Sequence, residues 1–281
     1  MSVRSMLFRW SSAGIRGRWS RIHDVRLSSG QRLLVPQDMH WSFSEGSYYE
    51  KNVEYWLVRL ASNMENCIFY DIGANLGFYA VLLAPWTRKT FAFEPSPRTT
   101  GILRKNVNRN KLSERIEILA LGISDYDGFG DLHLYTSIGN NSLHERKIPD
   151  GHALRHVGIE TVPIASLDSA RATYKLEAPD LIKIDIEGGE LSALRGAEQT
   201  LRDCSPIVLF EYSETTARDA GYKRRALLDF LEPLGYQFFG LSSDPGDPSL
   251  KVLGPPNPLI DNIIAVPKRH SVLVAELLLD S

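Results

Sequence analysis

The first residues with clear chemical potential form a loop that opens with a carboxylate and contains two glycines. Residues 71 to 77 are Asp-Ile-Gly-Ala-Asn-Leu-Gly. Gly73 and Gly77 lack a Cβ atom and can adopt positive φ, so the backbone can approach a ligand closely. In doubly wound α/β sheets, nucleoside-type ligands bind beside such a loop after the first strand. We therefore expect Asp71, Gly73, Asn75 and Gly77 to bind a cofactor.

The spacing of this loop discriminates between two cofactors. The fingerprint G-x-G-x-x-G places the pyrophosphate of a dinucleotide at a helix N-terminus. Here the spacing is G-x-x-x-G, and Asn75 stands where a second glycine would fall. A carboxylate at Asp71 is unfavourable beside a diphosphate but favourable beside a sulfonium and an α-amino group. The loop therefore favours S-adenosylmethionine over a nicotinamide dinucleotide.

Three further residues at expected strand ends are candidate cofactor ligands. Glu94 lies 23 positions after Asp71, close to the offset of roughly 20 residues at which a carboxylate meets ribose hydroxyls. Ser124 and Asp125 follow the third expected strand, where Asp125 could accept a hydrogen bond from an adenine amine. The alternative for Asp125 is a simple turn residue.

A fourth expected strand, at residues 181–186, carries charges among apolar side chains. Alternation places Lys183, Asp185 and the following Glu187 on one side of the strand. Charges inside a strand that is buried on both faces are unfavourable unless they are paired or functional. We therefore expect Lys183 to pair with a carboxylate, and Asp185 and Glu187 to approach the ligand as catalytic residues.

Glu211 ends the next expected strand and would lie beside Asp185 if the two strands are neighbours. Adjacent carboxylates either share a proton, which raises one pKa into the range of a base, or hold a divalent cation that acidifies a hydroxyl. Both possibilities stay open, with Asp185 and Glu211 as the metal ligands in the second. The alternative is a purely structural ion-pair network. We predict Asp185, Glu187 and Glu211 as the catalytic set.

The elements that must position these residues alternate between strands and helices from residue 67 onward. This alternation predicts a doubly wound, Rossmann-like α/β fold with a mainly parallel seven-stranded sheet. The segment 242–258 is rich in Pro, Gly and Asp and is expected to be a loop. The last strand is expected at the sheet edge, and Phe78 and Tyr79 in the core. The expected strands are 67–72, 89–93, 116–121, 181–186, 207–212, 236–241 and 262–266, with helices at 76–84, 99–110, 190–201 and 223–234.

An inserted segment at about 125–163 breaks the alternation. Its two runs of period-two pattern, at 131–135 and 159–164, predict an antiparallel flap. A flap here could close over an acceptor, and its histidines include possible bases, His144 or His152. The alternative is ordinary loop surface, and the spacings form no metal-ligand set. The four flap histidines are His133, His144, His152 and His156.

The whole chain sets further limits on function. Its 281 residues hold 32 Lys and Arg against 34 Asp and Glu, so no overall field favours a nucleic-acid backbone. No apolar stretch approaches the roughly 18 residues that span a bilayer, and no secretory signal is apparent. Cys67 and Cys204 each stand in an apolar run, as expected of buried thiols in a reducing compartment. We expect a cytoplasmic enzyme that acts on a small-molecule or glycan acceptor.

The domain organisation is expected to be simple. Residues 1–44 are a basic N-terminal extension, 45–268 form the catalytic domain, and 269–281 are a C-terminal tail. A hydrophobic content of 43% is sufficient for one large core.

Four segments taken together resemble the FkbM methyltransferases, a class I S-adenosylmethionine-dependent family. They are residues 71–79, 91–95, 182–190 and 209–211, and the resemblance covers about 45 to 266. It implies the class I methyltransferase fold and O-methylation of a hydroxyl on a sugar, glycan or secondary metabolite. Residues 47–50 also resemble a family segment near the cofactor, which implies a cofactor-binding role for Glu50. Residues 137–155 match no family pattern.

Two other functions compete with methyl transfer. A nicotinamide-dependent oxidoreductase is disfavoured by the glycine spacing and by the lack of a Tyr-x-x-x-Lys pair after the insertion. A non-catalytic nucleoside-binding module is disfavoured by the retained charges at Lys183, Asp185, Glu187 and Glu211.

Overall fold

The computed structural model describes residues 21–37, 39, 50–149, 151–242, 250–252, 260–270 and 272. The expectations for residues 1–20 and for most of the 269–281 tail lie outside the described residues. Within the described part of the chain, no helix is both long and apolar enough to cross a membrane.

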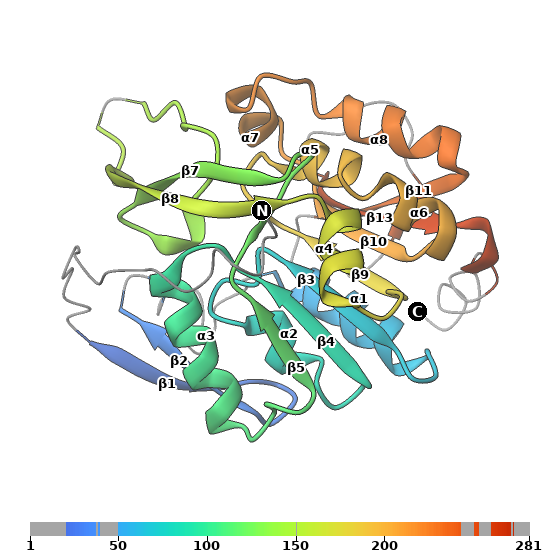
Figure 1. Cartoon of the computed structure of the whole chain (residues 1–281), viewed down its shortest axis with the longest axis horizontal. Coiled ribbons are helices and arrows are strands. Elements are labelled where there is room, and N and C mark those ends of the chain that lie inside the picture. Colours follow the sequence, from blue (N-terminus) through green and yellow to red (C-terminus); the bar gives the residue numbers. More distant parts are fainter. Residues whose placement is uncertain are drawn as a thin grey trace.

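The centre of the molecule is an eight-stranded sheet with the strand order β12-β11-β13-β10-β9-β3-β4-β5 (Figure 1). The five strands from β10 to β5 pair in parallel, whereas β13 runs antiparallel to both β10 and β11. This arrangement confirms the doubly wound, mainly parallel α/β fold. The strands are β3 (Ile68–Ile72), β4 (Lys89–Phe93), β5 (Ile116–Leu119), β9 (Leu181–Ile184), β10 (Ile207–Glu211), β11 (Tyr236–Ser242), β12 (Leu250–Val252) and β13 (Ile260–Pro267).

Two details of the expected sheet were wrong. The sheet has eight strands instead of seven, because the short strand β12 forms within the segment expected to be a loop and pairs with β11. The last strand, β13, is an internal strand and not an edge strand. β13 pairs with β10 along one edge and with β11 along the other. Its residues Ile263, Ile264 and Ala265 are buried because both faces of the sheet are covered.

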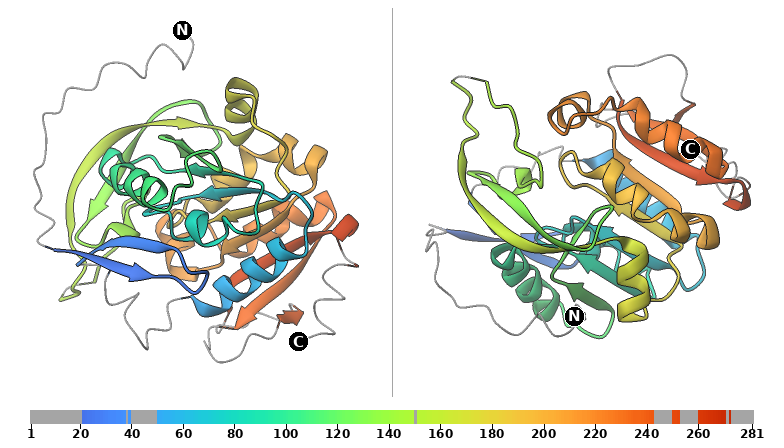
Figure 2. Two further views of the ribbon diagram at one scale, coloured as in Figure 1. Left: turned by 90° about the horizontal axis from the view of Figure 1, so that it is seen from below. Right: turned by 45° about the horizontal axis from the view of Figure 1, so that its top comes forward.

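Helices cover both faces of the sheet and produce three layers (Figures 1 and 2). One face is covered by α1 (Lys51–Ser62), α2 (Phe78–Leu82) and α3 (Pro97–Arg109), which share a core with Phe69 and Leu209. On the other face of the sheet, Tyr70 and Phe210 belong to a second core. The helices of that face are α4 (Leu167–Tyr174), α5 (Glu190–Arg195), α6 (Glu198–Cys204) and α8 (Arg225–Leu231), with the 3-10 turn η4 (Glu232–Leu234) after α8.

The helix expected at 190–201 is interrupted, which corrects the sequence-based prediction. A Cβ atom on Gly196 would lie 1.9 Å from the backbone oxygen of Ser124, so the turn between α5 and α6 needs a glycine. The new helix start is capped by Asp168, whose carboxylate accepts the N–H groups of Gln199 at 2.9 Å and Thr200 at 2.8 Å. Tertiary contacts therefore divide this helix.

The inserted segment forms a second, three-stranded sheet with the order β6-β8-β7, seen above the main sheet in Figure 2. The strands are β6 (Gly122–Ile123), β7 (Gly128–Tyr135) and β8 (His156–Ala165), and β7 and β8 pair antiparallel as expected. The flap has its own small core of Leu132, Leu134, Val162 and Ile164. The connection between β7 and β8, which contains the 3-10 turn η3 (Ile138–Asn140), carries the residues that reach the site.

A hairpin of β1 (Ile22–Arg26) and β2 (Arg32–Pro36) packs against α3. Leu33 and Val35 are fully buried in the core beneath it. The Leu34 N–H also donates to the side-chain oxygen of Asn106 at 2.7 Å. Part of the segment expected as an N-terminal extension is therefore bound to the α/β layers by apolar burial.

Candidate active site

The loop after β3 is built as its glycines predict. Gly73 and Gly77 have φ values of 83° and 86°. A Cβ atom on Gly73 would lie 2.0 Å from the backbone oxygen of Asp185, and one on Gly77 would lie 2.3 Å from a methyl carbon of Leu103. The glycines therefore let the loop pack against the end of β9 and against α3.

Asp71 lies beneath this loop. Its side chain is buried, and one carboxylate oxygen accepts the N–H of Ala80 in α2 at 3.0 Å. The other oxygen has no hydrogen-bond partner among the described residues. Burial raises the pKa of Asp71 to about 6, although attraction to Lys183 acts in the opposite direction. Asp71 is not among the described residues that line the cavities, and its hydrogen bond goes to helix α2 instead.

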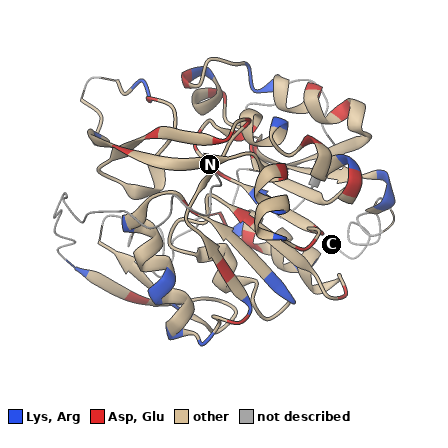
Figure 3. Ribbon diagram, viewed as in Figure 1, with Lys and Arg blue, Asp and Glu red and all other residues tan. Residues whose placement is uncertain are grey.

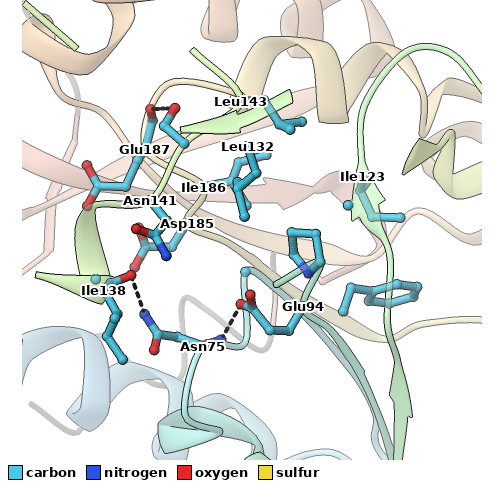
Figure 4. A pocket seen from close by; sticks show the side chains of 16 residues that line it. Asn75, Glu94, Ile123, Leu132, Ile138, Asn141, Leu143, Asp185, Ile186 and Glu187 are labelled. Carbon is cyan, nitrogen blue, oxygen red and sulfur yellow. Dashed lines mark hydrogen bonds between the residues drawn. The ribbon is translucent and has the colours of Figure 1, made fainter. Parts of the chain in front are cut away.

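A first cavity opens between the loop, the end of β4 and the flap (Figure 4). Glu94 lies at its floor and accepts two backbone N–H groups, from Asn75 at 3.0 Å and from Ser96 at 2.9 Å. Burial raises the pKa of Glu94 to about 7, while these two hydrogen bonds lower it. Apolar side chains form the opposite wall. They are Ile123, Leu132, Ile138, Leu143 and Ile186.

Asn75 links the cofactor loop to the flap. Its side-chain NH₂ donates to the backbone oxygen of Ile138 at 3.4 Å, as Figure 4 shows. Its side-chain oxygen is buried and has no hydrogen-bond partner among the described residues. A buried amide oxygen without a partner is costly unless a ligand supplies the donor. The contact of Asn75 that is established is the one through its amide nitrogen, which joins the loop to the flap beside the cavity.

Ser124 and Asp125 lie outside the lining of this cavity. Ser124 is buried and donates its N–H to the backbone oxygen of Ala165 at 3.0 Å, whereas Asp125 is exposed. Gly122 and Ile123, just before them, line the cavity instead. Gly77 is also not among the described lining residues, because it faces Leu103.

A second cavity continues from the first one toward β10. The two share Gly73, Asn75, Asp185 and Glu187 among their lining residues. The second cavity adds Glu211 from β10 and Glu50 from the start of α1. The structure thus brings together residues that are about 160 positions apart, and in Figure 3 red and blue segments meet near the centre of the molecule. The remaining described lining residues include Phe78, Tyr79 and Lys183.

Lys183 forms the expected ion pair with a carboxylate. Its Nζ atom lies 2.7 Å from Oδ2 of Asp185 and 4.5 Å from the centre of the Tyr79 ring, and its side chain is only 3% exposed. Burial lowers the pKa of Lys183, but attraction to Asp185, Glu50 and Asp71 outweighs this effect and raises the pKa overall. Lys183 therefore stays charged and neutralises part of the surrounding acid.

Glu187 is paired with a cation from the flap. Its carboxylate lies 2.7 Å from Arg146, and its backbone oxygen accepts the Ser142 hydroxyl at 2.7 Å. Burial and repulsion from Asp185 raise the pKa of Glu187 to about 8, while Arg146 lowers it. The sequence analysis missed Arg146, because residues 137–155 match no pattern and only the tertiary structure brings the two charges together.

Glu211 is the carboxylate of this group with the least compensation. One of its oxygens accepts the Thr216 hydroxyl at 3.3 Å. Among the described residues, no Lys, Arg or His forms an ion pair with it, in contrast to Asp185 and Glu187. Burial, together with repulsion from Glu187 and other acids, raises its pKa well above the usual value.

Glu50 and Tyr79 form one wall of the second cavity. The Tyr79 hydroxyl donates a hydrogen bond to the Glu50 carboxylate, and burial raises the pKa of Glu50. Tyr79 was expected only in the core. It is buried there, but its ring also lies under Lys183 and its hydroxyl faces the cavity. The sequence signal for this dual role is that two aromatic residues, Phe78 and Tyr79, directly follow the glycine-containing loop.

The residues of this site do not suit a divalent cation. In the described ranges, no three or more His, Cys, Asp or Glu side chains are grouped to hold a metal ion. Asp185 is paired with Lys183, which would repel a cation. None of the four flap histidines is among the described residues that line the two cavities. His133 and His156 contact each other, with 3.2 Å between ring nitrogens.

The fold and the site define a Rossmann-like methyltransferase. The chain matches the family model of the methyltransferase FkbM domain over residues 71–238, and it belongs to this family. This match confirms the resemblance in the sequence and identifies the protein as an S-adenosylmethionine-dependent methyltransferase.

Individual relatives match more weakly. The chain is 28% identical over 176 residues to the 2-O-methyltransferase NoeI of Sinorhizobium fredii, covering 58% of this chain and 70% of that protein. It is 26% identical over 156 residues to the hexuronic acid methyltransferase AglP of Haloferax volcanii, covering 55% and 60%. A solved structure, methyltransferase FkbM of Methylobacillus flagellatus, is 17% identical with a TM-score of 0.45, covering 71% of this chain and 43% of that one.

Proposed function

We propose that this protein transfers the methyl group of S-adenosylmethionine to a hydroxyl of a sugar, glycan or hydroxylated secondary metabolite. The observation that carries the proposal is that two adjoining cavities share Asp185 and Glu187 in their lining, with Glu94 in the first and Glu211 in the second. The names of two relatives support parts of this proposal, since one is a 2-O-methyltransferase and the other acts on a hexuronic acid.

The residues of the first cavity fit the nucleoside part of this cofactor. The carboxylate of Glu94 is held in place by two backbone N–H groups, and its remaining lone pairs can accept ribose hydroxyls. The apolar side chains of Ile123, Leu132 and Leu143 provide flat contact for an adenine ring.

The second cavity suits the part of S-adenosylmethionine that carries the sulfonium. S-adenosylmethionine supplies an electrophilic methyl group on a sulfonium. Glu50, Asp185, Glu187 and Glu211 surround this region, and Lys183 and Arg146 offset only part of their charge. The acids outnumber the two cations, and a bound sulfonium favours their ionised form, whereas the diphosphate of a dinucleotide would be repelled by them.

Glu211 is the general base in this proposal. Asp185 and Glu187 are each paired with a cation, and Glu50 accepts the Tyr79 hydroxyl and is attracted to Lys183. Glu211 has the least compensation and is therefore the carboxylate best able to take a proton. As the acceptor oxygen forms a bond to the methyl carbon, the bond from that carbon to sulfur breaks and the hydroxyl proton passes to Glu211. The products are a methyl ether and S-adenosylhomocysteine. The role of the other residues is to align the two reactants.

Calorimetry with two ligands tests the cofactor. We expect heat of binding with S-adenosylmethionine and none with NAD. Heat with NAD alone would replace the proposal with the oxidoreductase alternative. Transfer of a labelled methyl group to a hydroxylated acceptor, identified by mass spectrometry as an ether, then tests the reaction itself. A labelled ester or amine as the sole product would refute hydroxyl methylation.

A further inference from the structure

A third cavity opens beyond Glu211, on the side away from the nucleoside pocket. Its volume is about 300 Å³, which is within the range of small-molecule sites. It shares Glu50 and Glu211 with the second cavity, so these two carboxylates stand at the junction between cofactor and acceptor space. The other described lining residues are Lys51, Asn52, Val53, Ser213, Leu241, Ser242, Asp261 and Asn262.

Glu211 and Asn262 lie side by side on neighbouring strands and both line this cavity. They are direct register partners of the neighbouring strands β10 and β13, so their side chains lie on the same face of the sheet. The side-chain amide of Asn262 is half-buried and makes no hydrogen bond to any residue in the described ranges. A carboxylate that accepts beside an amide that donates and accepts can bind two adjacent hydroxyls.

The charge of the cavity restricts its ligand. Glu50, Glu211 and Asp261 supply three carboxylates, and the single basic residue among the described lining is Lys51. An acceptor with its own carboxylate would be placed beside this acid. The ionised acids would repel this carboxylate, which, unlike a hydroxyl, cannot donate a hydrogen bond to them. A neutral or cationic polyol meets no such penalty.

We propose that the third cavity is the acceptor site and that it takes a neutral or amino sugar ring and rejects uronic acids. The hydroxyl to be methylated lies at Glu211, and a neighbouring hydroxyl is bound by Asn262. This inference rests on the proposed function and adds the substrate class and a specificity residue. It separates this protein from the relative named as a hexuronic acid methyltransferase.

Matched acceptors test the substrate class. The probes are p-nitrophenyl glycosides of the gluco, galacto and manno series, each as the neutral hexoside, the 2-amino sugar and the uronide. With labelled S-adenosylmethionine, we expect methylation of neutral or amino members at rates at least about tenfold above the matching uronide. Equal or faster methylation of the uronides would overturn the inference. Methylation of no member while the cofactor binds would also overturn it, whereas loss of cofactor binding would refute the proposed function.

A variant of Asn262 tests the specificity residue. We expect Asn262→Ala to raise KM for the best acceptor about tenfold, while kcat and the Kd of S-adenosylmethionine change less than twofold. The matched control is Asn108→Ala, an exposed asparagine on α3. An unchanged KM, or a parallel loss of cofactor binding, would remove Asn262 from the acceptor site. Asn262→Asp adds a further carboxylate and should increase the preference against uronides.

Discussion

The two ends of the active site hold the same kind of side chain in opposite environments. At the nucleoside end, Glu94 is buried but accepts two backbone N–H groups in a fixed geometry. At the acceptor end, Glu211 is surrounded by other carboxylates and accepts one hydroxyl hydrogen bond, from Thr216. Burial raises the pKa of both carboxyls. Hydrogen bonds oppose the shift at Glu94, whereas repulsion adds to it at Glu211.

This difference separates binding from proton transfer. Two backbone N–H donors favour the ionised form of Glu94 and fix its position, so it can serve as an acceptor for a ligand. A carboxylate that its neighbours repel gains most from taking up a proton. In the proposed function, the same residue type therefore binds the cofactor at one end of the site and acts as a base at the other.

The largest expected effect follows from the acceptor end. Replacing Glu211 with Gln removes the base and should lower kcat by about 10²- to 10⁴-fold, while calorimetry shows an unchanged Kd for S-adenosylmethionine. Glu214→Gln, an exposed acid on α7 (Glu214–Asp219), is the control. A kcat within threefold of the wild type would exclude Glu211 as the base.

The pH dependence of kcat sharpens the same assignment. Glu211 is active as the ionised carboxylate, and its pKa is raised well above the usual value. The kcat of the wild-type protein should therefore rise with pH until that raised pKa is passed, and the Gln variant should lose this rise. A profile that is flat from pH 5 to 9 in the wild type would contradict the assignment.

The next effect concerns the cation between the two ends. Lys183→Met should lower the free energy of unfolding by about 3 to 5 kcal/mol, because it leaves buried acids without their partner. Denaturant unfolding at pH 7 measures this loss, and Lys105→Met on the exposed face of α3 is the control. Similar stability of the two variants would show that Lys183 is dispensable for the fold.

A smaller effect is expected at the nucleoside end. Glu94→Gln leaves one oxygen for the two N–H donors and should raise the Kd of S-adenosylmethionine about 10- to 100-fold. The kcat at saturating cofactor should change little, in contrast to the Glu211 variant. Glu117→Gln, an exposed acid on β5, is the control. A selective loss of kcat in the Glu94 variant would break the division between the two ends.

The smallest effect is on stability and comes from Glu187. Its pKa in the folded state is raised from 4.5 to about 8, so its contribution to stability is complete below pH 4.5 and is lost as the pH rises through 8. We expect unfolding of the cofactor-free protein in urea to show a fall on the order of 1 kcal/mol between pH 6 and 9. Glu187→Gln should reduce this slope. A slope that the substitution leaves unchanged would assign the loss to other groups.

The sequence by itself determined the strand ends that carry the chemistry. The glycines at 73 and 77 require positive φ, and alternation places Lys183 on the same face of the sheet as the acids around it. The antiparallel flap follows from its period-two pattern. These features are local, because they depend on the period of a strand or the steric needs of a turn.

Only the tertiary structure decided which cation pairs with which carboxylate of the site. Arg146 reaches Glu187 from a flap loop with no recognisable pattern, and Tyr79 turns a core position into a wall of the site. The position of β13 between β10 and β11 places Asn262 beside Glu211. Strand order and loop closure create these contacts, and neither leaves a periodic signal in the chain. For that reason the sequence predicted that Asp185 and Glu211 lie on neighbouring strands, but not that Glu211, unlike Asp185 and Glu187, has no ion pair with a cation among the described residues.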